Sequence, residues 1–331
     1  MRAALVLLAA LPACALLDED AGLETATAAQ SACPSEGDGP PDDLACTGLS
    51  AHARRYAPGA VLWSDGADKT RYLDLPEGAA IDAHDPGGWR FPVGTKAWKE
   101  FRMDGRLVET RFMQKVRDDR WISAAYVWNA DGTKATRGEG TRVDLGSGRS
   151  HAVPTNAECN DCHKGAFDRL LGLEPVSMSL PGAEGFDRLP PKAALPAVDP
   201  GLVWLHANCG SCHGRSSTAT AYGTGLRLRI GADEIAARPV EAWDLFTTTV
   251  GVTARTPDFD GETRVVAGDP GASLIVRLAR TRGPGQMPTV GSDVVDAEGV
   301  ARVEAWIRSL APQSSFGAST ERSAPASASA R

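Results

Sequence analysis

The sequence lacks the patterns that mark most nucleotide-binding and nucleic-acid-binding proteins. It has no phosphate-binding glycine loop, no dinucleotide fingerprint and no cluster of lysine and arginine. Its formal net charge of −7 makes nucleic acid an unsuitable partner. No Ser-His-Asp arrangement suggests a hydrolase, and no apolar run is long enough to span a membrane. With 42% hydrophobic and 23% charged residues, the 331-residue chain has the composition of a globular protein.

The N-terminus has the pattern of an export signal. Arg2 precedes a short apolar run over residues 3–11. The run ends in Leu-Pro-Ala-Cys14, which resembles the cleavage site of bacterial lipoproteins. We therefore expect residues 1–13 to be a lipoprotein signal peptide and Cys14 to carry the lipid. The alternative is an ordinary cleaved signal. The expected location is the periplasm, with a lipid anchor to the membrane.

Two copies of a Cys-x-x-Cys-His motif carry the main chemical signal. The first is Cys159-Asn-Asp-Cys162-His163 and the second is Cys209-Gly-Ser-Cys212-His213. Two cysteines three positions apart on a helical turn point the same way and can bond the two vinyl groups of one porphyrin. The adjacent histidine can then bind the iron. This spacing predicts c-type haem at the second motif and a second haem at the first.

The sixth position of each iron is the next question. Met287 lies in a loop rich in glycine and proline downstream of the second motif, and we expect it to be the distal ligand there. For the first motif Met178, His151 and an open position all remain candidates. Alternatives to haem also remain: a zinc site at the second motif, a Cys159–Cys162 disulfide or a metal site using His163 at the first, and a core role for Met287.

Two further cysteines, Cys33 and Cys46, lie near the expected mature N-terminus. After Cys14 and the four motif cysteines are assigned, these two are left over. In an oxidising compartment they form a natural disulfide pair.

The predicted fold class is α+β, multidomain, with a β-rich N-terminal domain followed by an all-α cytochrome c domain. A tether is expected over residues 14–46 and a β-rich domain over residues 47–150. The first haem-motif segment covers 151–195, the cytochrome c domain 196–311 and a disordered tail 312–331. Asp104-Gly105 predicts a hairpin between strands at residues 96–103 and 106–116, and residues 121–128 read as a further strand.

Local signals place the helices of the second half. Thr155 and Glu158 form a capping box at the first motif. Asp199-Pro200 and Asp269-Pro270 each predict a helix start, and Asp296 caps a helix through residues 300–310. Alternation at residues 227–230 suggests a strand within an insertion.

Residues 196–311 resemble the class I cytochrome c domain. The resemblance rests on the second motif, on Gln286-Met287-Pro288 and on the terminal Ala-Trp306-Ile segment. It implies thioether bonds at Cys209 and Cys212, with His213 as proximal ligand and Met287 as distal ligand. The chain also resembles a family of uncharacterised exported bacterial proteins with two such motifs. That likeness rests on residues 62–69, 91–95, 109–111 and 126–129.

These observations favour an exported c-type cytochrome that transfers single electrons to redox partner proteins and catalyses no reaction of its own. A redox enzyme with two haems, such as a peroxidase with one open distal site, is the alternative. A third interpretation makes the β-rich domain a binding module for a partner or polymer.

Overall fold

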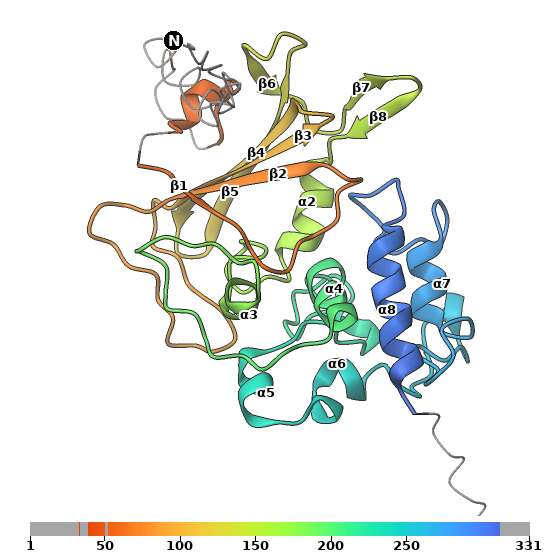
Figure 1. The fold of residues 1–331 in the computed structure, drawn as a ribbon. Helices are drawn as coiled ribbons and strands as arrows, with labels where there is room; N and C mark the ends of the chain where they lie inside the picture. Colours follow the sequence, from red (N-terminus) through yellow and green to blue (C-terminus); the bar gives the residue numbers. More distant parts are fainter. Residues whose placement is uncertain (1–32, 34–38, 50–51, 312–331) are drawn as a thin grey trace, which may run out of the picture.

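The computed structural model describes residue 33, residues 39–49 and residues 52–311, which form a mixed α+β structure (Figure 1). Every named strand lies between Arg54 and Ala152, and the elements that follow are helices. The predicted signal peptide, Cys14 and the tail over 312–331 lie outside the described residues. No helix within the described ranges is long and apolar enough to cross a membrane.

Six antiparallel strands form the main sheet in sequence order. Asp104 and Gly105 both have positive φ, at 51° and 77°, so the predicted two-residue hairpin between β3 and β4 is confirmed. The predicted strand ending at Trp128 is also confirmed. The strands are β1 (Arg54–Tyr56), β2 (Asp68–Asp74), β3 (Lys96–Met103), β4 (Arg106–Arg117), β5 (Arg120–Trp128) and β6 (Ala135–Arg137).

A separate two-stranded sheet, β7 (Arg142–Gly146) and β8 (Arg149–Ala152), leads from the main sheet to the first motif. It projects beside β3 and β4 in Figure 1. His151 on β8 is buried, so this connection is fixed against the sheet and is not a free linker.

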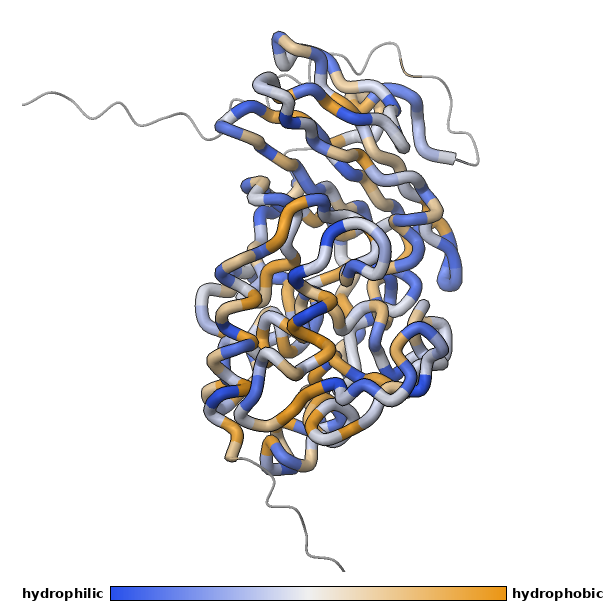
Figure 2. The backbone as a smooth tube through the Cα atoms, turned by 90° about the vertical axis from the view of Figure 1, so that its right-hand side faces the viewer, coloured by the Kyte–Doolittle hydropathy of each residue, from blue (hydrophilic) through white to orange (hydrophobic). Residues whose placement is uncertain are grey.

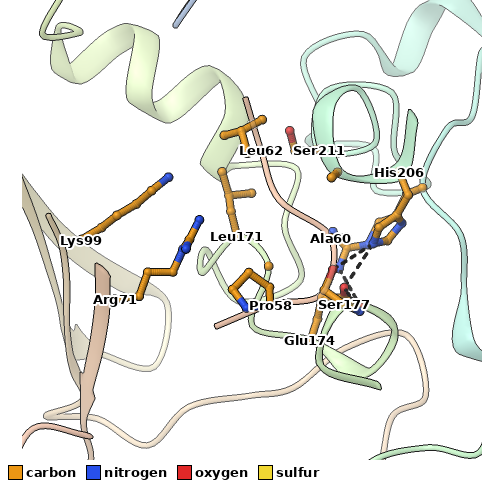
Figure 3. Close-up of a pocket in the computed structure, with 13 residues that line it drawn as sticks. Pro58, Ala60, Leu62, Arg71, Lys99, Leu171, Glu174, Ser177, His206 and Ser211 are labelled. Carbon is orange, nitrogen blue, oxygen red and sulfur yellow. Dashed lines mark hydrogen bonds and ion pairs between the residues drawn. The ribbon is translucent and has the colours of Figure 1, made fainter. Parts of the chain in front are cut away.

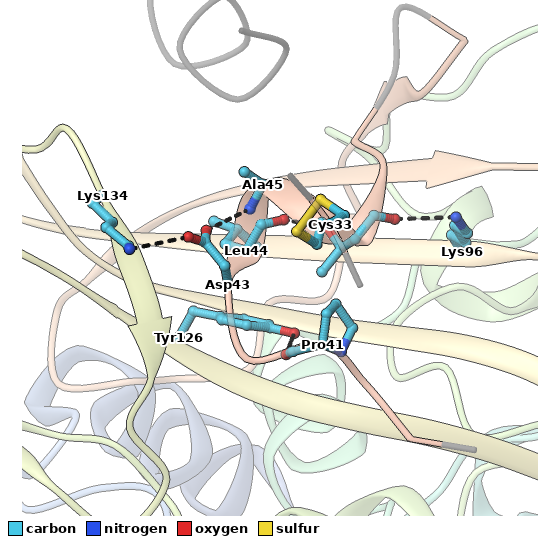
Figure 4. The surroundings of a disulfide bond; sticks show 10 residues. Cys33, Pro41, Asp43, Leu44, Ala45, Lys96, Tyr126 and Lys134 are labelled. Carbon is cyan, nitrogen blue, oxygen red and sulfur yellow. Dashed lines mark hydrogen bonds and ion pairs between the residues drawn. A yellow bond between two sulfur atoms is a disulfide. The ribbon is translucent and has the colours of Figure 1, made fainter. Parts of the chain in front are cut away.

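The N-terminal segment covers one face of the main sheet, which corrects the expected tether. Leu44, in the 3-10 helix η2 (Leu44–Thr47), packs with Leu49 against Trp98 and Phe112. These side chains bury apolar area, so residues 44–49 are part of the folded structure. Cys33 and Cys46 form a disulfide here, and Tyr126 donates to the Pro41 carbonyl (Figure 4).

The other face of the sheet is covered by the segment that follows the first motif. Leu73 and Ala97 pack there against Leu170, Leu173 and Met178. The first motif itself lies on α2 (Asn156–His163), and the segment that follows it contains α3 (Pro175–Ser179). Because a strand alternates its side chains between the two faces, the residues of β2, β3 and β4 on this face include Arg71, Lys99 and Met113, which line cavities beside the motifs.

The C-terminal half is built around α4 and α8. Leu202 and Leu205 of α4 pack against Val303 and Ile307 of α8. Figure 2 shows apolar stretches running through this half, while apolar and polar residues alternate along the strands. The elements are α4 (Pro200–Asn208), η3 (Tyr222–Thr224), α5 (Ala232–Ala237), η4 (Val240–Ala242), α6 (Asp244–Thr247), η5 (Pro257–Phe259), α7 (Leu274–Arg280) and α8 (Ala297–Ser309).

The helix caps at Thr155, Asp199 and Asp296 are confirmed, whereas two local predictions are wrong. Asp269 accepts from the Ala272 amide and closes a turn, so α7 begins five residues later at Leu274. Residues 227–230 form no strand, because their backbone bonds to side chains and to the second motif, as in Leu228 N to His213 O at 2.7 Å.

Candidate functional site

The first motif forms most of a short helix beside the sheet. The capping box starts α2, with the Thr155 hydroxyl accepting from the Glu158 amide at 3.2 Å. Cys159, Cys162 and His163 then lie on one and a half turns of helix. The local sequence therefore places both thiols and the imidazole within one short, rigid element.

The second motif begins at the end of α4. Cys209 is the residue that caps this helix, and the chain then continues in a tight turn. The His213 amide donates to the Cys209 carbonyl at 2.8 Å, so the motif keeps one helical turn. The two cysteines are again three positions apart on a turn.

The two motifs contact each other directly. The Sγ atoms of Cys162 and Cys212 are 3.9 Å apart. A Cβ on Gly165 would lie 1.8 Å from the Ser211 carbonyl oxygen, so the backbones meet at this glycine. The Thr220 hydroxyl donates to the Asp161 carbonyl at 2.5 Å and holds the loop after the second motif on the first. The sequence did not predict this arrangement.

His163 is buried and has one ring nitrogen fixed by the backbone. Its Nδ1 lies 2.5 Å from the Arg169 carbonyl, which can only accept, so Nδ1 carries the proton and Nε2 is left with a free lone pair. Arg169 has φ of 66°, a conformation that is uncommon for arginine and that positions this carbonyl. Burial, and then the charges of Lys99 and Arg111, lower the pKa of His163 to about 4. A neutral imidazole of this kind is suited to bind a metal.

A cavity of about 180 Å³ adjoins the first motif. Cys159 and His163 form one side, and Met113 and Trp121 of the sheet form another. Met113 was not singled out from the sequence, although the predicted strand contained it. Only the packing of α2 on the sheet brings it to this cavity.

The loop after His163 is fixed to the sheet by a buried carboxylate. Asp168 accepts from Lys115 Nζ at 2.7 Å and from Trp121 Nε1 at 2.9 Å. It also accepts from the Phe91 amide at 2.7 Å. Both side chains of the Lys115–Asp168 ion pair are less than 10% exposed. Asp168 therefore positions the Arg169 carbonyl that bonds to His163.

His213 is also buried. Burial, and then the charges of Arg264 and Arg227, lower its pKa to about 4, so this imidazole is neutral as well. Thr224 Oγ1 lies 3.5 Å from Nδ1. Met287 is half-buried and packs against an apolar cluster of Ala254, Leu274 and Leu278.

The four motif cysteines are free thiols. Burial raises the pKa of Cys209 to about 12, and burial also raises the pKa of Cys159. Within residues 39–49 and 52–311, no three His, Cys, Asp or Glu side chains gather as a metal-binding set.

The other candidates for distal ligand at the first motif have different partners. Met178 is 3% exposed and packs in the core with Leu173. His151 Nε2 lies 2.7 Å from Glu109 Oε2. Neither side chain lines the cavity beside His163.

A buried Ser-His-Glu group lies between the sheet and α4 but does not have the geometry of a hydrolase. Ser177 Oγ and Glu174 Oε1 each lie 3.2 Å from the same nitrogen of His206, Nε2. The other nitrogen accepts from the Ile230 amide at 3.0 Å. A catalytic triad needs its serine and its acid on different ring nitrogens. His206 is therefore a structural residue.

The segment over residues 62–69 forms a junction between the two halves of the molecule. Asp65 accepts from the amides of Asp293 and Val294 at 3.0 and 2.8 Å. Trp63 Nε1 donates to the Val294 carbonyl at 2.8 Å. Lys69 Nζ donates to the Leu62 carbonyl at 2.9 Å. Trp63 and Asp65 therefore join this segment to residues 293–294.

The donor set of the site suits two c-type haems. Each motif offers two thiols and a neutral histidine, and at the first motif the histidine has its Nδ1 bonded to a carbonyl and its Nε2 available. The sheet closes one side with Met113 and Trp121. No family model matches the chain, and no curated protein and no solved structure matches it.

Proposed function

We propose that this protein is an exported c-type cytochrome that transfers electrons through two covalently bound haems. The observation that carries the proposal is the contact between its two Cys-x-x-Cys-His motifs, in which the Sγ atoms of Cys162 and Cys212 lie 3.9 Å apart. The motifs come from separate segments of the chain. Gly165 allows their backbones to approach closely, and the hydrogen bond from Thr220 to Asp161 links them. Adjacent haems would let an electron pass between them within one molecule.

The proposed roles follow from the donor atoms. Cys159 and Cys162 would form the thioether bonds of the first haem, and His163 Nε2 would bind its iron. Cys209, Cys212 and His213 would do the same for the second haem, with Met287 as its distal ligand. The haem supplies the one-electron redox chemistry, and the chain supplies the ligands, burial and orientation. Residues 196–311 would then be a cytochrome c domain.

The proposal includes export and anchoring. Residues 1–13 are proposed to be a lipoprotein signal peptide and Cys14 the lipid-bearing residue, which would place the cytochrome in the periplasm on a membrane. Attachment of haem to cysteine outside the cytoplasm is consistent with this location. Its partners would be redox proteins at the same surface.

Paired cysteine variants test the assignment of the two haems. Replacing Cys159 and Cys162 with alanine should leave one haem per chain, and so should replacing Cys209 and Cys212. The Cys33→Ala/Cys46→Ala variant is the control, because it removes a disulfide outside the motifs and should keep two haems. Haem content is measured by the pyridine haemochrome assay after expression with the c-type maturation machinery. Two haems in either motif variant would contradict the proposal.

One observation favours a redox enzyme as the second candidate function. The cavity of about 180 Å³ beside His163 leaves room for a small molecule near the first haem. Spectroscopy separates the two candidates. A carrier has low-spin ferric haems that do not bind cyanide, whereas an enzyme of this kind has a high-spin component that does. Met287→Ala should create such a component at the second haem, and Met113→Ala tests the distal side of the first.

A further inference from the structure

Three basic residues lie side by side across the sheet, on the face that meets the motifs. Arg71 of β2 is paired in register with Lys99 of β3, and Lys99 with Arg111 of β4. Lys69 is two positions from Arg71 on the same face. Like charges directly opposite each other on neighbouring strands repel, and this repulsion destabilises a sheet. A row of three needs a compensating charge.

The described residues supply only part of that charge. The carboxylate of Glu174 lines the same cavity, but its oxygens already face His206 at 3.2 Å and Arg229 at 3.8 Å. Arg111 donates to both carboxylate oxygens of Glu109, at 2.6 and 3.0 Å. Within the described ranges, no carboxylate forms a salt bridge with Arg71 or Lys99. Arg71 is only 6% exposed, and Lys99 Nζ lies 4.8 Å from the centre of the Phe101 ring. A buried guanidinium without a counter-ion carries a large desolvation cost.

Burial and the repulsion among these cations lower the pKa of Lys99 and of Lys69. Burial, and then the charges of Arg71 and Arg111, lower the pKa of Lys99 well below 10.5. The same causes, in the same order, lower the pKa of Lys69 to about 8. Lys69 and Lys99 therefore lose a proton more readily than an ordinary lysine when no anion is bound beside them.

The row borders a cavity between the sheet and the two motifs. Arg71 and Lys99 point into it from the strands, and the opposite side includes Leu171, which follows the first motif, and Ser211, inside the second (Figure 3). Its volume of about 40 Å³ is enough for a group of a few atoms, since a cavity needs roughly 10–15 Å³ to hold one water. A carboxylate matches this size, and arginine binds carboxylate through two parallel hydrogen bonds.

We propose that Arg71 and Lys99, supported by Arg111, form a binding site for a carboxylate group between the β-rich part and the two motifs. One source is a propionate of a haem, and in this respect the inference rests on the proposed function. The other source is a small carboxylate from solution. In both cases the sheet supplies the positive charge that the anion needs, which gives the β-rich part a role in the redox site.

Neutral variants of the holoprotein test the site through the direction of the stability change. Haem content is measured first, so that loss of haem, which contradicts the proposed function, is distinguished from failure of the site. Arg71→Met and Lys99→Met should each lower the urea midpoint and the haem midpoint potential. The urea midpoint should fall because the bound carboxylate would lose its ion-pair partner. The midpoint potential should fall because its negative charge would then be left uncompensated near the haem. Arg102→Gln is the control, since Arg102 is on β3 but pairs with Glu100 on the other face.

Acetate titration identifies the source of the carboxylate. If the potential of the wild-type protein shifts with acetate and that of Arg71→Met does not, the site takes a carboxylate from solution. If neither responds but both variants lower stability and potential, a propionate fills the site. The inference is wrong if Arg71→Met and Lys99→Met raise the urea midpoint. It is also wrong if they change the midpoint potential no more than Arg102→Gln does. Either result would show that no carboxylate is bound at Arg71 and Lys99.

Discussion

Gly165 is the residue at which the two motifs meet. An added Cβ would lie 1.8 Å from the Ser211 carbonyl oxygen, so Gly165→Ala forces the backbones apart. We expect a loss of about 2–3 kcal/mol in the free energy of unfolding, measured by urea denaturation of the holoprotein. Gly223→Ala is the matched control, because nothing lies within 4 Å of its Cβ position. Equal effects at the two glycines would contradict the backbone contact.

Glu174 makes stability depend on pH in the acid range. Burial alone would raise its pKa, but the hydrogen bond from the neutral His206 imidazole and the charge of Arg229 outweigh burial and lower it. Because the folded pKa lies below the ordinary value of 4.5, the stabilisation is complete above pH 4.5 and is lost as pH falls below it.

Glu174→Gln should therefore destabilise the protein by about 3 kcal/mol at pH 7, because it removes one partner of a buried pair. The difference from wild type should shrink between pH 4.5 and pH 3. Urea denaturation at pH 7, 4.5 and 3 measures both effects. A difference that stays constant over this range would show that the carboxylate of Glu174 has no depressed pKa.

Single residues were predictable from the sequence where the signal is local. The two motifs, the Thr155 cap and the Asp104-Gly105 turn each depend on neighbours within a few positions, and short spacing encodes them. Met113 and Arg71 are different. Each lies in an unremarkable strand, and its position beside the motifs depends on which face of the sheet the helices cover.

Among the elements, α2 and the loop after it depend most on the sheet. Asp168→Asn leaves Lys115 buried without its charged partner. We expect a loss of about 3–5 kcal/mol, which is typical of one broken partner in a buried ion pair. Chemical denaturation of the holoprotein measures the loss.

The double variant Lys115→Met/Asp168→Asn provides the control for this prediction. It removes both charges and should recover part of the lost stability, because no unpaired ion remains in the interior. If the destabilisation of the double variant equals the sum of those of Asp168→Asn and Lys115→Met, the two residues are not coupled.

Regular elements were predicted better than irregular ones. The strands β3 to β5 and the starts of α2, α4 and α8 follow from alternation, turn residues and caps. The helix expected at Asp269-Pro270 starts later, since Asp269 closes a turn instead. Residues 227–230 alternate like a strand, but their amides bond to the motif and to side chains such as His206. Such long-range partners leave no local pattern.

At the scale of the whole molecule, Asp65 holds the two halves together. It accepts from Ser292 Oγ and from the amides of Asp293 and Val294. Asp65→Ala should speed limited proteolysis within residues 283–294, because that loop would lose its anchor. Glu262→Ala, at a surface ion pair with Arg277, is the control. Unchanged cleavage in Asp65→Ala would show that other contacts hold the junction.

The mixed α+β character of the chain was predictable, whereas the relation between its parts was not. The sequence suggested a tether before residue 47, yet Leu44 packs on the sheet. It also suggested two separate motif segments, yet Cys162 and Cys212 lie 3.9 Å apart. Both features come from packing between segments far apart in the chain, which spacing and composition do not encode.

The number of haems per chain tests the central claim most directly. The mature protein is produced with the c-type maturation machinery, and its haem content is determined by pyridine haemochrome assay together with intact mass. The account predicts two covalent haems on each chain. One haem would reduce one motif to a structural role, and no haem would contradict the proposed cytochrome function altogether.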